Sequence, residues 1–283
     1  MKSVLVLGDE RKGGSRAVVE EAAGWLAAHG ARVDVVLDRD SSLAAHRADL
    51  VVVFGGDGSM LGAMRRMASN QMPTLGINLG RLGFLTAFDR TRTREALELA
   101  LAGQLREETL GILECSVVEP GHPPSEPVLA MNDAVVSRAH AGGIVTVRAL
   151  RDGVELATYR GDGLIVATAA GSTAYSLAAG GPVLTPELDA FVLTPLASHT
   201  LSARPLVLPA CTIELELLDP VGRRSGQLQL DGQVNLPMGR GSKAILRSAP
   251  FRFRHLIPGP DHFFQALRAK FGFADMPRTS LQP

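Results

Sequence analysis

The sequence lacks the features that mark disulfide-rich, cysteine-zinc and membrane proteins. Its 283 residues include only two cysteines, Cys115 and Cys211, which fit no C-x-x-C spacing. This excludes a disulfide framework and favours a reducing compartment. The apolar runs fall short of the ~18 residues that cross a membrane, and Val4–Leu7 is too short for the core of a signal peptide. We therefore expect a soluble, cytoplasmic protein with no membrane partner.

An excess of positive charge is also missing. Lys and Arg together number 29, as do Asp and Glu, so the formal net charge is zero. A general nucleic-acid binder needs excess positive charge to displace counterions from phosphates, so we expect no nucleic-acid partner. A local basic pocket for a small phosphate ligand remains open. The chain is 46% hydrophobic, enough to bury a core, and its length fits one large or two modest domains.

Strand and helix patterns alternate over the first hundred residues. Leu50–Phe54 is apolar at every position, as expected of a strand buried on both faces. Alternation of this kind predicts a parallel sheet with flanking helices, and we assign residues 1–108 to this α/β domain. The other predicted strands are Val4–Leu7, Val33–Leu37 and Thr74–Asn78, and the predicted helices are Ser15–His29, about Ser59–Ala68 and Glu95–Ala102.

Beyond Leu110 the pattern changes to short, strand-like runs separated by turn residues. The predicted strands are Ile112–Glu119, Val128–Ser137, Ile144–Arg151, Val154–Arg160, Leu164–Thr168, Thr212–Leu218, Leu228–Leu230, Lys243–Arg247 and Phe251–Ile257. Asp152-Gly153 between two such runs is typical of a tight hairpin. We predict a mainly antiparallel β domain over residues 109–258. Helical periodicity returns near Asp261, and we expect residues 259–283 to pack back on the first domain. The apolar face predicted for this last helix consists of Phe263, Phe264, Leu267 and Phe271.

A glycine-rich turn, Gly55-Gly56-Asp57-Gly58-Ser59, follows a buried strand and opens a helix. Its glycines let the backbone approach a ligand, and the helix N-terminus favours an anion. Asp57 is the only side chain of the turn suited to acid–base work. Arg11 and Lys12, in the loop after the first strand, could meet a phosphate at the same sheet edge. An ordinary strand–helix turn and a solvated basic loop are the alternatives.

Asn132 and Asp133 interrupt an apolar run predicted as one strand, Val128–Ser137. A buried amide and carboxylate are costly without partners. In a regular strand they would point to opposite faces, so a bulge or a strand end is needed for both to meet one ligand. A vicinal diol such as a ribose offers the matching hydrogen-bonding groups. An edge-strand pair satisfied by neighbouring backbone is the alternative.

The longest of the candidate site segments runs from Arg160 to Pro182 and is rich in glycine, alanine and other small residues. A buried strand leads through Ala-Ala-Gly into a helix start, where Ser172 or Thr173 would be the N-cap. Small residues there leave room for a ligand ring, and Tyr175 offers an aromatic face. The G-x-S-x-G pattern of a nucleophile elbow and the H-E-x-x-H metal pattern are both absent. Elsewhere, Phe84 between two glycine turns could cover a flat ligand or simply belong to the core.

Taken together, these motifs resemble those of the NAD kinase family, in the family's order and over essentially the full length. Where the family usually has Thr-Pro-Thr-Gly, this chain has Thr168-Ala169-Ala170-Gly171, and losing the proline predicts a looser turn before Gly171. Ser59 stands where the family often has threonine. The matching segments are Gly55–Gly58, Gly80–Leu85, Asn132-Asp133, Gly161–Pro182, His199–Leu206, Asp231–Gln233 and Leu267–Lys270.

The resemblance implies an α/β N-terminal domain, a β-sandwich-like C-terminal domain and an active site between them. It implies transfer of a phosphoryl group from ATP, with Mg²⁺, to the adenosine ribose 2′-hydroxyl of NAD, giving NADP. Asp57 would be the general base, and no fixed protein ligands are predicted for the metal. The family's homodimers or homotetramers imply that a second subunit could complete the pocket. A lipid or sugar kinase and a non-catalytic dinucleotide sensor are the alternatives.

Further binding roles follow from the same resemblance. Asn132 and Asp133 would hold the adenosine ribose, and Arg160 and Asp162 the nicotinamide side. The remaining residues expected to contact NAD are Gly58, Phe84, Thr173, Ala174, Tyr175, Ser176, Leu177, Ala178 and Gln233. Those expected at the ATP phosphates are Gly55, Gly56, Gly58, Ser59, Arg11 and Lys12. The sequence does not decide between NAD and NADH, or between ATP and polyphosphate, nor does it reveal feedback by NADP or NADPH.

Overall fold

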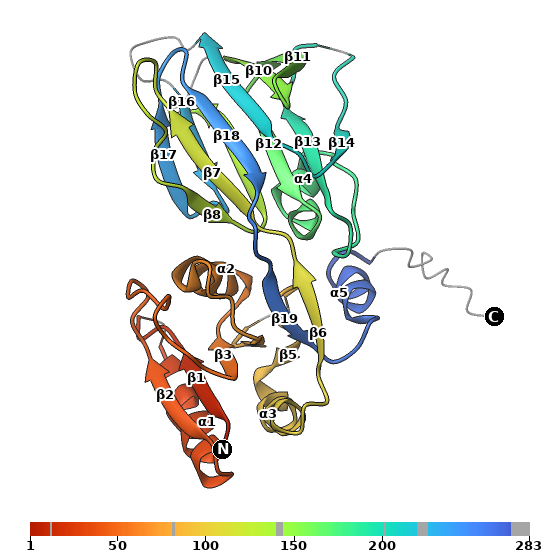
Figure 1. Cartoon of the computed structure of the whole chain (residues 1–283). Helices are drawn as coiled ribbons and strands as arrows, with labels where there is room; N and C mark the ends of the chain where they lie inside the picture. Colours follow the sequence, from red (N-terminus) through yellow and green to blue (C-terminus); the bar gives the residue numbers. More distant parts are fainter. Residues whose placement is uncertain (12, 81–82, 140–143, 201, 220–225, 273–283) are drawn as a thin grey trace, which may run out of the picture. The chain divides into compact units, whose positions relative to one another are not determined.

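The structure, a computed structural model, describes residues 1–272 except 12, 81–82, 140–143, 201 and 220–225. The chain forms two compact units (Figure 1). Unit 1 combines Met1–Glu108 with the segment that begins at Arg254, and unit 2 is Thr109–Phe253. No helix in the described part of the chain is long and apolar enough to cross a membrane.

Unit 1 is built on a seven-stranded sheet with the order β2-β1-β3-β4-β19-β6, and β5 also pairs with β4. β1 runs parallel to β2 and β3, and β4 runs parallel to β3, β5 and β19. The strands are β1 Ser3–Leu7, β2 Arg32–Val36, β3 Leu50–Phe54, β4 Thr74–Asn78, β5 Phe88–Asp89, β6 Arg106–Leu110 and β19 Phe253–Ile257.

Helices cover both faces of this sheet. The β1–β2 and β3–β4 connections run in opposite directions along it, so right-handed crossovers put their helices on opposite faces. The helices are α1 Ser15–Ala28, α2 Asp57–Met67, a 3₁₀ turn η1 Arg90–Arg92, and α3 Thr93–Leu101. Val4, Val6 and Val52 pack with α1 and α3, whereas Leu5 and Val51 are buried on the other face. The predicted α/β architecture is confirmed.

The last helix, α5 His262–Phe271, belongs to unit 1. Its predicted apolar face is only partly right, because Phe264 and Phe271 are 46% and 50% exposed while His262, Ala266 and Leu267 are buried. Asp261 stands at the N-cap position, but its side chain caps no backbone N–H.

Unit 2 is a sandwich of two six-stranded sheets in which neighbouring strands run antiparallel. Apolar residues from both sheets form one buried core between them. The first sheet has the order β11-β10-β15-β18-β7-β8 and consists of β7 Leu113–Val118, β8 Val128–Ala130, β10 Val145–Arg151, β11 Val154–Gly161, β15 Ile213–Asp219 and β18 Lys243–Ser248.

The second sheet has the order β14-β13-β12-β9-β16-β17. Its outer face is covered by the segment that carries a 3₁₀ turn, η2 Ala170–Thr173, and a one-turn helix, α4 Tyr175–Ala178. Its strands are β9 Asp133–Arg138, β12 Gly163–Thr168, β13 Ala190–Leu196, β14 Leu206–Pro209, β16 Gly226–Leu230 and β17 Val234–Met238.

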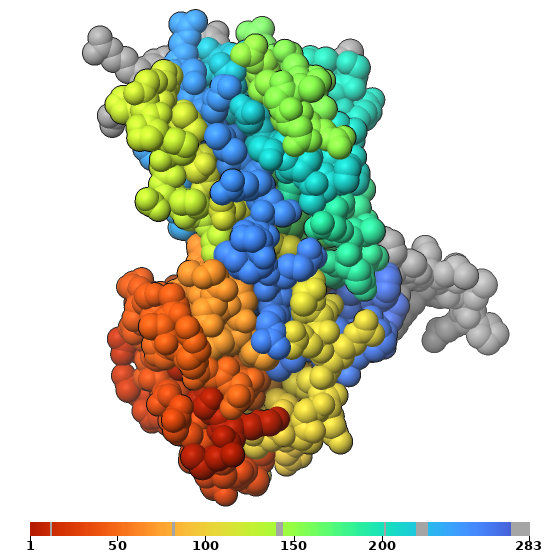
Figure 2. All heavy atoms as spheres, viewed as in Figure 1, coloured from red at the N-terminus to blue at the C-terminus, as the bar shows by residue number. Residues whose placement is uncertain are grey.

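The predicted hairpin joins β10 and β11, which lie at the surface of unit 2 (green in Figure 2). Asp152 and Gly153 both have positive φ, 49° and 81°, as the tight turn between twisted strands requires. Three strands that the sequence did not predict, β13, β14 and β17, each contain a proline. β14 and β17 are edge strands, where a missing N–H is tolerated, and Pro195 of β13 lies beyond the stretch that β14 pairs.

Replacing Leu215 by alanine tests the sandwich core. Leu215 is fully buried on β15, so Leu215→Ala should lower the free energy of unfolding by about 2–5 kcal/mol. Urea unfolding followed by circular dichroism measures the change. The matched control is Leu206→Ala on the edge strand β14, which should cost less than about 1 kcal/mol because that side chain is already exposed. Equal losses in both variants would contradict the assigned core.

Candidate active site

The glycine-rich turn delivers Asp57 as the first residue of α2. Gly56 is the N-cap and has an extended backbone. A Cβ built on Gly55 would lie 2.1 Å from Ser59 Oγ and 2.6 Å from Ser59 Cβ, so a side chain at Gly55 would displace Ser59. A carboxylate in the first turn of a helix is stabilised by the helix dipole. The helix begins two residues earlier than predicted, which brings Asp57 into that favourable position.

The Asp57 carboxylate accepts hydrogen bonds on both oxygens. Oδ2 accepts the backbone N–H of Phe84 at 3.0 Å, and Oδ1 accepts that of Leu85 at 3.0 Å. Thr86 Oγ1 lies 3.4 Å from Oδ1, and Lys270 Nζ of α5 lies 3.4 Å from Oδ2. The side chain is 29% exposed, so it remains open to a ligand while its orientation is fixed.

The segment that holds Asp57 is itself tightly packed. A Cβ on Gly83 would lie 1.8 Å from Asp57 Oδ1, so only glycine fits this approach. Asn78, at the end of β4, donates from Nδ2 to Thr86 Oγ1 at 2.8 Å. The Phe84 ring packs on Phe263 and Phe271 of α5, with ring centroids 5.9 Å apart in both pairs. Phe84 therefore joins the site through its backbone N–H, which the sequence did not suggest.

The basic loop after β1 lies at the carboxyl ends of the parallel strands, where α/β sheets usually bind ligands. A cavity of about 30 Å³ there is bounded by Gly8, Asp9, Ser59 and Arg66, among others. The Arg11 guanidinium lies 3.4 Å from the buried Asp9 carboxylate. Lys12, the other residue predicted to meet a phosphate, lies outside the described residues.

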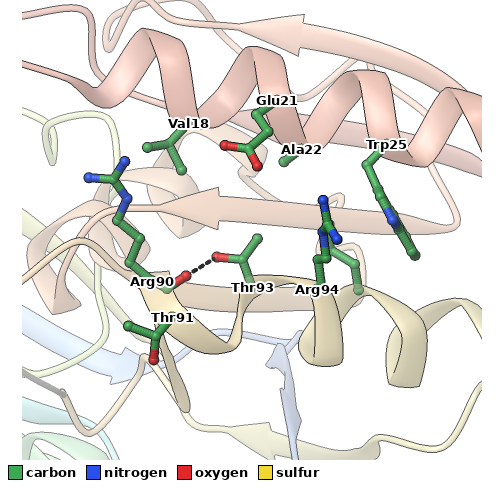
Figure 3. Close-up of a pocket in the computed structure, with 9 residues that line it drawn as sticks. Val18, Glu21, Ala22, Trp25, Arg90, Thr91, Thr93 and Arg94 are labelled. Carbon is green, nitrogen blue, oxygen red and sulfur yellow. Dashed lines mark hydrogen bonds between the residues drawn. The ribbon is translucent and has the colours of Figure 1, made fainter.

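A larger groove of about 340 Å³ lies between α1 and α3, on the face of the sheet that these two helices cover. Figure 3 shows Arg90 and Arg94 extending toward α1 and Glu21, with the Thr93 hydroxyl donating to the Arg90 carbonyl at 2.8 Å. The lining of this groove includes none of the predicted site residues. It is therefore separate from the glycine-rich turn.

In unit 2, Asn132 and Asp133 lie where the chain leaves one sheet for the other. The strand predicted over 128–137 is broken into β8, which pairs with β7, and β9, which pairs with β12 and β16. The break is held by the Asp231 carboxylate, which accepts the backbone N–H groups of Met131, Asn132 and Asp133 at 3.1, 2.7 and 3.2 Å. This is the strand end that a shared ligand of both side chains requires.

The Asp133 carboxyl is 4% exposed. Burial, reinforced by the nearby Asp231 charge, raises its pKa to about 7, and the backbone N–H of Tyr175 acts in the opposite direction. Near neutral pH this carboxyl therefore exchanges between a form that donates and a form that only accepts hydrogen bonds.

The turn before Gly171 is well held despite the missing proline. The Thr168 hydroxyl donates to the Met131 carbonyl at 2.5 Å and accepts the Gly171 N–H at 3.0 Å. A Cβ on Gly171 would lie 1.8 Å from the Asn132 carbonyl oxygen, so this glycine fixes how closely the two segments approach.

The predicted N-caps at Ser172 and Thr173 are wrong. Both residues lie inside η2, and α4 begins after Ala174. Ser172 Oγ instead accepts the Leu184 N–H at 2.9 Å, because the segment folds back on the sheet rather than forming a long helix. Tyr175 is 46% exposed and Ser176 is buried against Thr194, at 2.7 Å. Ala174 and Leu177 are half-buried, and Ala178 is exposed.

The residues predicted for the nicotinamide side lie at the other end of β12. Asp162 pairs with Arg138 at 2.6 Å, and Arg160 is exposed. β12 separates Asp162 from Thr168, which is about 20 Å at ~3.3 Å per residue. Gln233 is exposed in the turn that carries Asp231. One copy of unit 2 thus brings Asp133 and the Tyr175 backbone together, but keeps Arg160 and Asp162 away from them.

Several residues at these two sites were not predicted to have a role. Lys270, Thr86 and Asp231 contact the predicted residues directly. Lys270 and Asp231 lie in segments that resemble the family, but the sequence gave neither of them a role. Thr86 lies in no such segment, and no pattern in the sequence marks it. Among the described residues, no three His, Cys, Asp or Glu side chains are arranged to hold a metal ion.

Comparisons with known proteins match both units to one family. Residues 10–105 match the ATP-NAD kinase N-terminal domain, and residues 131–257 match the ATP-NAD kinase C-terminal domain. A curated NAD kinase of Desulforamulus reducens is 35% identical over 95% of this chain and 97% of its own length. This chain belongs to the NAD kinase family. An NAD kinase of an Azoarcus species is 40% identical over 82% of this chain and 78% of its own.

Solved structures of the NAD kinase family share the fold. The yeast NADH kinase complexed with NADH has a TM-score of 0.87 at 24% identity, covering 99% of this chain and 90% of its own. The Archaeoglobus fulgidus NAD kinase in complex with ATP has a TM-score of 0.77 at 27% identity, covering 94% and 97%. These likenesses confirm the α/β and β-sandwich architecture expected from the family.

Substituting Gly171 tests the approach of the two segments in unit 2. Gly171→Ala would force a Cβ into the Asn132 backbone, so we expect a loss of about 1–3 kcal/mol in the free energy of unfolding and weaker NAD binding. Urea unfolding and titration calorimetry measure the two effects. Gly24→Ala is the control, because a Cβ there meets nothing within 4 Å and should leave NAD binding unchanged.

The pKa of Asp133 predicts a pH-dependent loss of stability. Because burial raises the folded-state pKa from 3.8 to about 7, the folded state binds the proton more tightly than the unfolded state. This contribution to stability is complete below pH about 4 and is lost as pH rises through about 7. Relative to wild type, Asp133→Asn should therefore gain stability, by up to a few kcal/mol, between pH 4.5 and pH 8. A pH-independent difference in urea unfolding would contradict the raised pKa.

Proposed function

We propose that this protein is an NAD kinase that transfers the γ-phosphoryl group of ATP to the adenosine ribose 2′-hydroxyl of NAD. Membership of the family supports the reaction. The observation that carries the proposal is the Asp57 carboxylate, half-buried at the start of α2 and oriented by two backbone N–H groups. A carboxylate held in this way suits a hydroxyl that must be aimed at a phosphoryl donor.

Asp57 acts chiefly by orientation. A carboxylate is in general a weak base toward a sugar hydroxyl, which loses its proton far less readily than a carboxylic acid does. Phosphoryl transfer passes through a loose transition state, so in-line positioning accounts for much of the acceleration. Asp57 accepts the hydrogen bond of the 2′-hydroxyl and takes up its proton as the new O–P bond forms and the bond from the γ-phosphorus to the β–γ bridging oxygen breaks, which releases ADP.

ATP brings the divalent metal. Each Asp57 oxygen already has two donors nearby, and the described residues contain no cluster of carboxylates that would bind Mg²⁺ alone. Mg²⁺ commonly binds phosphate oxygens and retains several waters, which fits a site without its own cage. When bound, it neutralises charge on the phosphates. The glycine-rich turn, Ser59 and the basic loop with Arg11 and Lys12 meet the phosphates of ATP.

NAD binds through unit 2. Asn132 and Asp133 hold the adenosine ribose, since an amide and a carboxyl with a pKa of about 7 can both donate to and accept from a diol. Tyr175 offers its exposed ring beside the adenine, and Thr173, Ala174 and Ser176 shape the space around it. Leu177, Ala178, Phe84, Gly58 and Gln233 complete the contacts expected from the family.

The enzyme works as a homodimer or homotetramer in which Arg160 and Asp162 serve the pocket of a second copy. The separation of about 20 Å along β12 supports this arrangement, because one NAD bound at Asn132 and Asp133 would hardly reach Asp162 of the same copy. Both cysteines are free thiols, which fits a reducing cytoplasm.

Incubation with NAD, Mg²⁺ and ATP, with NADP as the measured product, tests the proposed reaction. NADP formation that depends on both substrates is the expected result. NAD binding by calorimetry without product would favour a dinucleotide sensor, and phosphorylation of a lipid or sugar in place of NAD would favour the other kinases. A panel of donors and acceptors then decides between ATP and polyphosphate and between NAD and NADH.

Replacing the Asp57 carboxylate should uncouple binding from catalysis. We expect Asp57→Asn to lower kcat by about 10²–10⁴-fold while the Kd for NAD changes only a few-fold, because unit 2 supplies most of the proposed NAD contacts. Steady-state kinetics and calorimetry measure the two quantities. Glu98→Gln, an exposed carboxylate on α3, is the control and should keep wild-type turnover. Near-normal turnover of Asp57→Asn would show that Asp57 is not the base.

Subunit mixing tests the shared pocket. Asp57→Asn and the double variant Arg160→Ala with Asp162→Ala should each be nearly inactive at low NAD. A mixed dimer would keep one intact pocket, so equal mixing should restore up to about a quarter of wild-type activity. Activity that stays at the level of the separate variants after verified subunit exchange would place all these residues in one copy.

A further inference from the structure

Two buried histidines of the C-terminal segment lie beside the backbone that holds Asp57. His255 on β19 is fully buried, and its Nε2 lies 3.0 Å from the Leu85 carbonyl oxygen. His262 at the start of α5 is also buried, and its Nε2 lies 3.2 Å from the Phe84 carbonyl oxygen. The same two residues, Phe84 and Leu85, donate their N–H groups to the Asp57 carboxylate.

We infer that His255 and His262 are positioning residues for Asp57, holding the far side of the Phe84–Leu85 backbone so that its N–H groups fix the carboxylate. This inference rests on the proposed function, since the aim of Asp57 matters only if it serves the transfer. Neither histidine contacts the Asp57 side chain itself within hydrogen-bonding distance.

The protons on these histidines follow from their partners. The second nitrogen of His255, Nδ1, lies 2.8 Å from Glu108 Oε1. A carbonyl oxygen can only accept, so Nε2 of His255 carries a hydrogen and donates to Leu85. Burial, and then the charge of His255, lower the pKa of His262. The Phe84 carbonyl oxygen can only accept, so Nε2 of His262 carries a hydrogen and donates to it.

A continuous hydrogen-bonded path links His262 to Asp57. The Phe84 carbonyl and the Leu85 N–H belong to the same peptide group, so a donor on the carbonyl polarises the N–H that faces Asp57 Oδ1. Hydrogen bonds in such chains strengthen one another. His255 fixes the next peptide group, between Leu85 and Thr86, and Thr86 places its hydroxyl 3.4 Å from the same carboxylate oxygen.

The polar character of this cluster also points to a specific role. An apolar side chain at position 255 would suit a buried strand, whereas a histidine–glutamate pair there carries a desolvation cost. The pair lies directly against the Leu85 carbonyl, in the segment whose N–H groups hold Asp57. Misplacing a catalytic group by about 1 Å can cost on the order of 100-fold in rate. Residues that hold the Phe84–Leu85 backbone in place can therefore change kcat strongly without touching Asp57.

Kinetics of four variants test the inference in the full-length protein. We expect His255→Leu and His262→Leu to lower kcat by about 10–100-fold while KM for NAD stays within about threefold. His255→Gln should recover kcat to within about fivefold of wild type, because its amide can still donate to the Leu85 carbonyl. Leu26→Ala in α1 is the control, since it creates a cavity in the same unit without touching the Asp57 segment.

Amide hydrogen exchange gives a readout independent of turnover. In the wild-type protein the amides of Phe84 and Leu85 should be protected from exchange. In His255→Leu and His262→Leu, the exchange rates of these two amides should rise at least tenfold more than those of the other amides of unit 1. Leu26→Ala should accelerate exchange throughout the unit without singling out these amides.

The inference is overturned if His255→Leu and His262→Leu keep kcat within twofold of wild type. It is also overturned if Leu26→Ala lowers kcat as much as they do, or if His255→Gln has no higher kcat than His255→Leu. If the wild-type protein makes no NADP, the proposed function fails instead. The exchange rates of Phe84 and Leu85 then still report whether the histidines anchor this segment.

Discussion

The site in unit 1 depends on one interaction, the pair of hydrogen bonds from the Phe84 and Leu85 backbone to the Asp57 carboxylate. This pair ties the start of α2 to the segment between β4 and β5. The C-terminal segment adds Lys270 beside the carboxylate and the two histidines at the Phe84 and Leu85 carbonyls. Gly83 is required because any side chain there would occupy the space of the carboxylate. Backbone donors cannot rotate away as side chains can, so they fix the carboxylate more firmly than an exposed ion pair would.

Unit 2 uses the same device for a different purpose. The Asp231 carboxylate accepts three consecutive backbone N–H groups where the chain passes from one sheet to the other, and this frees Asn132 and Asp133 from the regular alternation of a strand. Asp231 has a positive φ of 51° in the turn between β16 and β17, a strained conformation for a residue other than glycine. The cost of burying Asp133 beside it appears as the raised pKa of Asp133.

Much of the fold could be predicted because local patterns and tertiary packing agree. Leu50–Phe54 and Thr74–Asn78 were predicted with their observed ends, since continuous burial leaves an unbroken apolar run. β13, β14 and β17 were missed because a proline, which cannot donate to a strand ladder, argues against a strand in the sequence. In the structure each proline lies on an edge strand or, in β13, beyond the stretch that β14 pairs, where that missing donor is tolerated. The N-cap predicted at Ser172 or Thr173 was wrong because Ser172 instead accepts a hydrogen bond from Leu184, twelve residues away, and the helix begins only at Tyr175.

The sequence by itself determined the two-part architecture, the glycine-rich turn with Asp57, and the polar pair Asn132-Asp133, because each is written in the spacing of neighbouring residues. Only the tertiary structure decided what surrounds them. Lys270 lies 213 positions from Asp57, and His255 lies 170 positions from Leu85, yet both pairs are in hydrogen-bonding range. Contacts over such separations arise from the order of strands in a sheet, which brings β19 beside β4, and no local periodicity encodes that order.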